Sequence, residues 1–195
     1  MMRLDYRFIE QHVPRGARVL DLGCGDGSLL KELIEKRDVD GIGIEIDETA
    51  VQDCISAGVP VYHGDMLEGI SMFEEGSFDV VILSRTLQQS LEPARLVSEI
   101  IRVGQLGIIS FPNFGYWPLR LKFLFSGRMP RDKKFKYSWH DSPNIHLLTV
   151  KDFVDYCRGN ELQIVDRIFF TPSYYRLPTL AANLFAALAV FVIKK

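Results

Sequence analysis

A glycine-rich turn constrains the fold of this chain more than any other feature. The apolar run Val19–Leu22 contains one acid, passes through three alternate glycines, and continues into Ser28–Ile34, which has the pattern of a helix. A strand that enters a helix through such a turn is typical of α/β domains that bind nucleotide-like ligands. Glycine permits positive φ angles and lets a ligand approach the backbone, so we expect this turn to offer free N–H groups. The turn residues expected at the ligand are Gly23, Cys24, Gly25 and Gly27.

The acid before the first glycine narrows the class of ligand. Asp21 stands at the end of the expected first strand, where its carboxylate would repel the pyrophosphate of NAD or FAD. The dinucleotide fingerprint G-x-G-x-x-G would also place its third glycine at Ser28, whereas this chain has Gly27. S-adenosylmethionine carries a sulfonium and an α-amino group, and both suit a nearby carboxylate. The motif therefore favours S-adenosylmethionine, or its product S-adenosylhomocysteine, as the cofactor.

Composition favours a single globular domain over residues 1–195. The chain has 47% hydrophobic and 25% charged residues, which is typical of a folded domain, and its length suits one α/β unit. A formal net charge of −2 gives no global attraction to nucleic acid or to an anionic membrane. The three separated cysteines form no C-x-x-C pair, and the first residues lack the apolar core of a signal peptide. We therefore expect a cytoplasmic protein with reduced thiols.

One apolar stretch near the C-terminus has to be tested against a membrane span. Residues 177–193 are almost free of charge, but they include Pro178 and Asn183. The stretch is also shorter than the ~20 apolar residues that a spanning helix needs. We expect a short helix over Thr179–Ala186 and a buried strand over Leu188–Ile193, with no membrane association.

Short β-rich runs alternate with helical stretches along most of the chain. The apolar runs show little alternation, as in strands that helices cover on both faces. Repeated strand–helix units imply parallel pairing with right-handed crossovers. The sequence therefore predicts an α/β fold with a doubly wound, mostly parallel sheet, and N-caps at Asp47 and Thr149. The predicted strands are Arg18–Leu22, Gly41–Ile46, Pro60–His63, Phe78–Leu83, Gly107–Phe111, Ile164–Phe170 and Leu188–Ile193. The other predicted helices are Ser28–Glu35, Glu48–Ala57, Pro93–Arg102 and Val150–Arg158.

Acids at the ends of the first three predicted strands should meet at one edge of the sheet. Ligands of doubly wound sheets bind at the carboxyl ends of the strands. There Glu45 can accept hydrogen bonds from both ribose hydroxyls, and Asp65 from an adenine amino group with Met66 against the base. A cap or turn role is the alternative for each acid, but three acids in phase beside the glycine turn favour a ligand. The predicted cofactor contacts are Asp21, Gly23, Cys24, Gly25, Gly27, Glu45, Ile46, Asp65, Met66 and Ser84.

Residues 112–149 interrupt the strand–helix rhythm with an aromatic and basic insertion. Insertions of this length are usually functional, and we expect a short helix over Pro118–Phe125 within it. Basic residues between aromatic rings can bind single-stranded nucleic acid, but a near-neutral chain favours a lid or a docking surface instead. The basic residues are Arg120, Lys122, Arg128, Arg131, Lys133, Lys134 and Lys136. The aromatic residues are Tyr116, Trp117, Phe123, Phe125, Phe135, Tyr137 and Trp139.

The sequence assigns neither a metal site nor an activated nucleophile. His140, Asp141 and His146 match no common metal-ligand spacing, and no cysteine joins them. The hydroxyl and thiol side chains near the strand ends lack a motif that would activate them. The catalytic residues are therefore unknown.

Three segments carry a specific family resemblance. Ser110–Trp117, Gly127–Pro130 and Ser142–His146 resemble the MetW family of bacterial methionine-biosynthesis proteins. The match extends over nearly the whole chain through Val19–Gly27, Gly43–Ile46, Phe78–Ser84 and Thr86–Gln88. The chain departs from the family pattern in having Arg85, Tyr116 and His140. The resemblance implies a class I S-adenosylmethionine-dependent methyltransferase fold of seven strands, with the last strand inserted antiparallel. It also implies a cofactor pocket at the positions given above and a partner, the homoserine O-acyltransferase of MetX type.

Two functions from different classes follow. As a partner and regulator of the acyltransferase, the chain would dock through Pro112–His146, because tryptophan and arginine are enriched at interface hot spots. The candidate anchors are Trp117, Arg120, Arg128 and Trp139. As a methyltransferase, the chain would align the methyl group with an unidentified small-molecule acceptor, which Ser84, Thr86 or Asn113 could orient. The partner role ranks first, because the specific resemblance lies in that segment.

Overall fold

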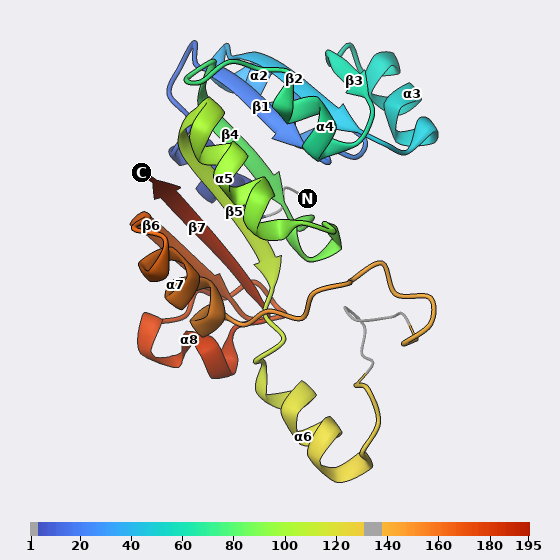
Figure 1. The fold of residues 1–195 in the computed structure, drawn as a ribbon, viewed down its shortest axis with the longest axis vertical. Helices are drawn as coiled ribbons and strands as arrows, with labels where there is room; N and C mark the ends of the chain where they lie inside the picture. Colours follow the sequence, from blue (N-terminus) through green and yellow to red (C-terminus); the bar gives the residue numbers. More distant parts are fainter. Residues whose placement is uncertain (1–3, 131–137) are drawn as a thin grey trace.

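The computed structural model describes residues 4–130 and 138–195, which form one seven-stranded sheet in the order β3-β2-β1-β4-β5-β7-β6 (Figure 1). Five strands run parallel, and β7 (Leu188–Lys194) is antiparallel to both of its neighbours, β5 and β6 (Gln163–Phe170). The predicted sheet with its antiparallel last strand is confirmed. The parallel strands are β1 (Arg18–Leu22), β2 (Asp40–Glu45), β3 (Val61–His63), β4 (Phe78–Ser84) and β5 (Gly104–Pro112).

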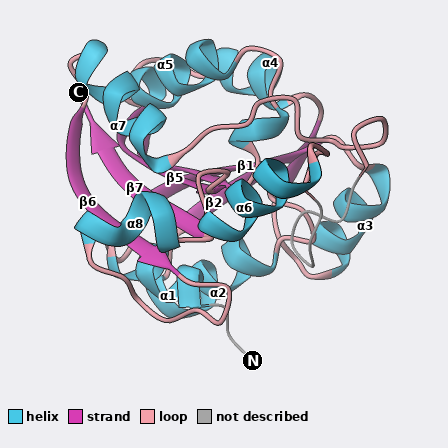
Figure 2. Cartoon of the chain, turned by 90° about the horizontal axis from the view of Figure 1, so that it is seen from below, coloured by secondary structure: helices cyan, strands magenta, loops and turns pink. Residues whose placement is uncertain are grey.

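Helices cover both faces of the sheet (Figure 2). One face packs against α4 (Met66–Ser71), α5 (Pro93–Val103) and α7 (Val150–Gly159). The other face packs against α1 (Leu4–Gln11), α2 (Ser28–Arg37) and α3 (Glu48–Ser56). The remaining helices are the 3-10 helix η1 (Leu87–Gln89), α6 (Trp117–Ser126) and α8 (Thr179–Phe185).

Side chains of the central strands alternate between two hydrophobic cores. In β4, Val81 and Leu83 enter the core under α5, whereas Val80 and Ile82 enter the core under α2. All of Leu188–Ile193 is buried in the same way, which explains why this stretch is continuously apolar. The predicted helix and strand at the C-terminus are confirmed. In the part of the chain that the structure describes, no helix is long and apolar enough to cross a membrane.

The predicted N-caps are confirmed, but three short helices escape the sequence pattern. The Asp47 side chain accepts from the Ala50 N–H at 2.9 Å, and Thr149 forms a capping box with Asp152. The sequence does not predict α1, α4 or η1. The last two have six and three residues, too few for a helical period to show.

The chain leaves the sheet after β5 and carries α6 beyond the carboxyl end of that strand (Figure 1). The helix predicted over Pro118–Phe125 is confirmed and extends by one residue at each end. Six of the basic and aromatic residues singled out above lie outside the described residues. They are Arg131, Lys133, Lys134, Phe135, Lys136 and Tyr137.

Candidate functional site

A cavity of about 870 Å³ lies at the carboxyl edge of the sheet, beside the glycine turn. Its volume is within the roughly 300–1,000 Å³ of typical small-molecule sites. Half of the predicted cofactor contacts line it, and they come from the ends of three neighbouring strands. These residues are Gly23, Glu45, Ile46, Asp65 and Met66.

The other predicted contacts are not among the residues that line this cavity. Asp21 is buried within β1, between β2 and β4. Ser84 ends β4, where its Oγ lies 3.3 Å from the Oγ of Ser110. Cys24, Gly25 and Gly27 belong to the turn between β1 and α2. The structure therefore divides the ten predicted contacts into five that line the cavity and five that do not.

The glycine turn uses its own N–H groups, contrary to the expectation that it offers them to a ligand. The N–H groups of Gly23 and Cys24 donate to the Ile44 carbonyl at 2.8 and 3.2 Å. The Gly25 N–H donates to Glu45 Oε2 at 2.8 Å, and the Gly27 N–H to the Cys24 carbonyl at 3.1 Å. The expectation is wrong for these four residues, because three of them donate to the end of β2 and Gly27 donates within the turn. A ligand without phosphates, such as S-adenosylmethionine, does not need those donors.

Glu45 connects the turn to the end of β2. Its Oε1 accepts from the N–H groups of Ile46 and Asp47 at 2.9 and 3.0 Å, and its Oε2 accepts from Gly25. Three backbone donors hold the carboxylate in one orientation at the cavity wall. An ionised carboxylate has about four acceptor sites, so Glu45 retains the capacity to accept from a ribose hydroxyl.

Asp65 has the cap role that was the alternative to ligand binding, and it also lies at the cavity. Its Oδ1 accepts from the N–H groups of Leu67 and Glu68 at 2.7 and 3.2 Å, which starts α4. Because the same residue lines the cavity next to Met66, the cap fixes Asp65 at the cavity wall. The adenine contact itself stays a prediction.

Buried thiols pack behind the glycine turn. The Sγ atoms of Cys24 and Cys54 lie 3.8 Å apart, and a Cβ on Gly27 would lie 2.9 Å from the Sγ of Cys54. Burial raises the pKa of both thiols, and the charge of Asp21 raises that of Cys24 further. Burial also raises the pKa of Cys157 to about 11. All three cysteines are free and buried, so they are neutral packing groups at pH 7.

The far wall of the cavity comes from residues that the sequence did not assign to the cofactor, and only Thr86 among them was considered there, as a group that could orient an acceptor. They follow β4 or lie on α4 and α5, opposite the glycine turn. The turn and the β4 loop meet closely, because a Cβ on Gly23 would lie 2.9 Å from the side chain of Thr86. The pattern Asp65-x-x-Glu68 resembles a capping box and could have indicated α4. These wall residues are Leu67, Glu68, Ser71, Thr86, Gln89, Ser90, Leu91, Glu92 and Arg95.

A partly buried ion pair ties α1 to the residue that follows β4. The Nη2 of Arg85 donates to Asp5 Oδ2 at 2.7 Å and to the hydroxyl of Tyr174 at 2.8 Å. Asp5 is fully buried, and Arg85 has a φ of 63°, which is strained for a residue with a Cβ. At Arg85, where the chain departs from the pattern of the family it resembles, the guanidinium therefore has an acid of its own chain as partner.

Asn113 has a structural role rather than a place at an acceptor. Its side chain is 0% exposed. Its Nδ2 donates to the carbonyls of Asn183 and Ala186 at 3.2 and 2.8 Å, and its Oδ1 accepts from the N–H groups of Gly115 and Val150 at 3.0 and 3.2 Å. The residue thus joins the end of β5 to the starts of α6 and α7 and to α8.

In residues 4–130 and 138–195, no group of three or more His, Cys, Asp or Glu side chains is placed so that it could hold a metal ion. His140 and Asp141 lie in a turn before the loop that contains His146. The backbone N–H of His146 donates to the Gln88 carbonyl at 3.0 Å, which attaches this loop to η1.

The chain has the fold of the class I S-adenosylmethionine-dependent methyltransferases. A solved structure described as a SAM-dependent methyltransferase from Archaeoglobus fulgidus matches with a TM-score of 0.70 at 18% identity, covering 99% of this chain and 91% of that one. Within this class, the chain matches the family described as "Methionine biosynthesis protein MetW" over residues 3–193. The chain belongs to the MetW family.

Two relatives match different shares of this chain. The bifunctional methionine biosynthesis protein MetXA/MetW of Rhodopirellula baltica is 33% identical over 178 residues, which are 87% of this chain and 29% of that protein. The ubiquinone biosynthesis O-methyltransferase of Methylococcus capsulatus is 32% identical over 110 residues, which are 53% of this chain and 46% of that enzyme. The chain therefore spans less than half the length of either relative.

Proposed function

We propose that this chain binds S-adenosylmethionine and acts in the cytoplasm as a partner and regulator of a homoserine O-acyltransferase of MetX type. The observation that carries the partnership is the relative whose name joins MetXA and MetW in one chain. Joining two modules covalently gives each a high effective concentration near the other, which benefits modules that act together.

The cavity at the carboxyl edge supports the choice of ligand. Glu45 would accept from a ribose hydroxyl, and Asp65 would accept from the adenine amino group with Met66 against the ring. Asp21, behind the turn, would favour the cationic end of the ligand through its charge. The ligand itself would supply a sulfonium and a transferable methyl group; the residues of the chain bind and orient it.

A regulatory role requires an energetic link between ligand and partner. S-adenosylmethionine is made from methionine, so a domain that binds it could report pathway output to the enzyme that activates homoserine. By linkage, the ligand can shift the acyltransferase only if it binds the free and complexed forms of this chain with different affinity.

The decisive experiment is a titration of the acyltransferase from the same organism with this chain. We expect a saturable change in the rate of homoserine acylation, with a half-saturating concentration that S-adenosylmethionine alters. No change in rate, with both proteins folded, would contradict the partner role.

The ligand site has its own test. Asp21→Asn and Glu45→Gln should each weaken S-adenosylmethionine binding by roughly 10- to 100-fold. The first removes a charge that attracts the cationic ligand, and the second weakens a hydrogen bond to a charged group, which contributes about 1.5–3 kcal/mol. Glu48→Gln makes the same charge change at an exposed position of α3 and should leave the affinity unchanged. Calorimetry measures all three, and an unchanged affinity for Glu45→Gln would contradict the assigned pocket.

A second candidate function is methyl transfer to a small molecule, which the match to ubiquinone biosynthesis O-methyltransferases favours. Of the three side chains considered for orienting an acceptor, Asn113 is buried in its own network. The Oγ1 of Thr86 donates to the Ser84 carbonyl at 3.1 Å, and Ser84 pairs with Ser110. Steady formation of S-adenosylhomocysteine with a metabolite would establish this alternative.

A further inference from the structure

Helix α6 carries an apolar stripe that its own chain leaves in solvent. Trp117, Leu121, Leu124 and Phe125 follow the spacing i, i+4, i+7, i+8, which places them on one side of a helix. Their exposed fractions are 41%, 41%, 71% and 81%. Leu119 is the buried residue of this helix. Such an apolar helix is normally covered, so we name these four residues the α6 stripe and ask what covers them.

The base of α6 is fixed although its stripe is open. Arg120 donates through Nε to the Gly115 carbonyl and through Nη2 to the Asn183 carbonyl at 3.3 Å, and the Asn113 network lies directly behind. A Cβ on Gly115 would lie 2.8 Å from the Asn183 carbonyl oxygen, so the approach is close. Among the described residues, α6 packs extensively against no other helix or strand. The chain therefore holds the first turn rigidly and presents the rest of the helix.

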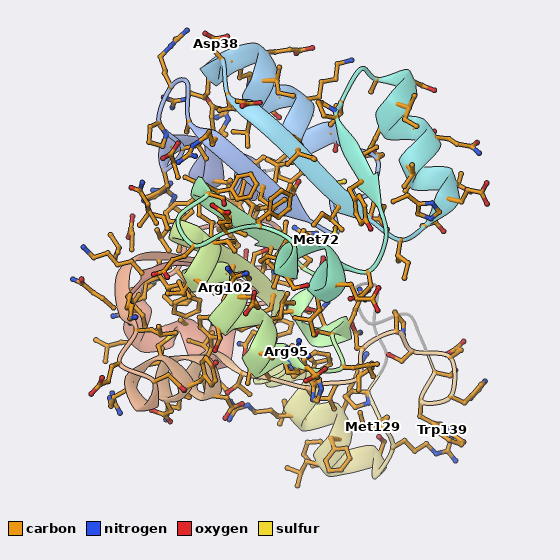
Figure 3. All side chains as sticks on the ribbon, turned by 45° about the horizontal axis from the view of Figure 1, so that its top comes forward. Asp38, Met72, Arg95, Arg102, Met129 and Trp139 are labelled. Carbon is orange, nitrogen blue, oxygen red and sulfur yellow. The ribbon has the colours of Figure 1, made fainter. Side chains whose placement is uncertain are left out.

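The flanking charge indicates what kind of surface fits the stripe. Residues 112–130 contain no Asp or Glu, whereas the whole chain has a net charge of −2. Arg120, Lys122 and Arg128 are the exposed basic residues of this stretch. Figure 3 shows Met129 and Trp139 in the same projecting region, away from the sheet. The complementary surface is an apolar groove with carboxylates at its rim.

We propose that the α6 stripe docks into an apolar, acid-rimmed groove on the homoserine O-acyltransferase. This inference rests on the proposed function, and the relative that joins both parts in one chain supports this occupant. A second copy of the chain fits less well, because two α6 helices would bring like charges together without an acid in residues 112–130. Insertion of one amphipathic helix into an apolar groove is a common recognition mode, with anchors at i, i+4 and i+7.

The test changes the stripe without touching the cavity. In the double variant Leu124→Asp/Phe125→Asp, the half-saturating concentration of this chain in the acylation titration should rise at least about 30-fold, because buried charges replace two anchors. Leu180→Asp on α8 is the matched control, since this leucine is 103% exposed and lies outside the stripe. Its half-saturating concentration should stay within about twofold of wild type. S-adenosylmethionine affinity, measured for each variant, reports that the domain is folded.

Each outcome decides the proposal. A double variant that binds S-adenosylmethionine and titrates like wild type overturns the docking surface, while the proposed function stands. A wild-type chain without effect on the acyltransferase overturns the proposed function itself. If the double variant loses S-adenosylmethionine binding, Phe125→Asp alone replaces it, with the same expectation of a weaker complex.

Two further measurements separate other occupants. Light scattering that shows a wild-type dimer and a monomeric stripe variant, with unchanged acyltransferase titration, would assign the stripe to a second copy. Sedimentation with vesicles of phosphatidylcholine and phosphatidylglycerol that the stripe variant alone fails to bind, again with unchanged titration, would assign it to lipid. Either result overturns the acyltransferase groove.

Discussion

The glycine turn and the base of helix α6 are both held by hydrogen bonds within the chain, but the surfaces that follow them differ. In the turn, the N–H groups and the Glu45 carboxylate satisfy one another, and the surrounding thiols fill the space behind. At the base of α6, Asn113 and Arg120 satisfy the backbone around Gly115. The turn then closes against its own chain, whereas α6 continues into solvent with its stripe exposed.

The two regions differ in the kind of surface that they leave open. In both regions, backbone N–H groups are paired with acceptors of the chain itself. What remains open at the turn is a concave cavity with fixed acids, which suits a small ligand. What remains open at α6 is a convex apolar surface, which suits another macromolecule. The comparison therefore predicts that changes in one region leave the binding function of the other intact.

Loss of the Asn113 side chain, which holds the base of α6, should destabilise the domain more than changes in the glycine turn or the α6 stripe. Asn113→Ala should lower the free energy of unfolding by about 3 kcal/mol, because it leaves several buried N–H and carbonyl groups without partners. Urea unfolding measures the loss. Asn160→Ala, at the exposed C-cap of α7, removes one hydrogen bond, from Nδ2 to the Tyr156 carbonyl at 2.9 Å, and should cost about 1 kcal/mol or less. Equal stability of the two variants would contradict the role of Asn113 as a structural centre.

Sequence patterning predicts most of the sheet, for a physical reason. Stretches buried on both faces, such as Val80–Leu83 of β4 and Leu188–Ile193, are continuously apolar and short, so composition marks them without knowledge of neighbours. The caps at Asp47 and Thr149 are equally local, because each bonds within three residues. Elements stabilised by distant contacts are not predicted: α1 is joined to the fold by the pair of Asp5 with Arg85.

The candidate site is predicted only in part, because its second half depends on tertiary contacts. The acids at the strand ends follow from the rule that ligands bind at the carboxyl edge. Whether the Gly25 N–H faces a ligand or Glu45 depends on how the turn folds over β2. The spacing of the glycines in the sequence does not predict this. The wall formed by Thr86, Gln89 and Arg95 comes from η1 and α5 across the sheet, where no local motif marks it.

Alanine at Gly27 should cost more stability than alanine at Gly58, because a thiol packs against Gly27. Gly27 and Gly58 have nearly the same φ, 72° and 73°, but a Cβ meets Cys54 Sγ at 2.9 Å only at Gly27; at Gly58 it meets nothing within 4 Å. Gly58→Ala should cost about 1 kcal/mol for the left-handed backbone. Gly27→Ala should cost about 1 kcal/mol more for the contact, and Cys54→Ala should relieve that excess. Thermal unfolding of the single and double variants measures it; equal costs at both glycines would mean that the thiol does not support the turn.

The smallest expected effect concerns the stability of α6 itself. Phe125→Ser should change the free energy of unfolding by less than about 0.5 kcal/mol, because the ring is largely in solvent and the two residues have similar helix propensities. Phe170→Ser, at a ring that is 1% exposed, should cost more than about 3 kcal/mol. A large loss at Phe125 would mean that its ring packs against its own chain and is not available to a partner. A negligible loss, together with a weakened complex, would mean that this large aromatic ring contributes to binding and not to folding.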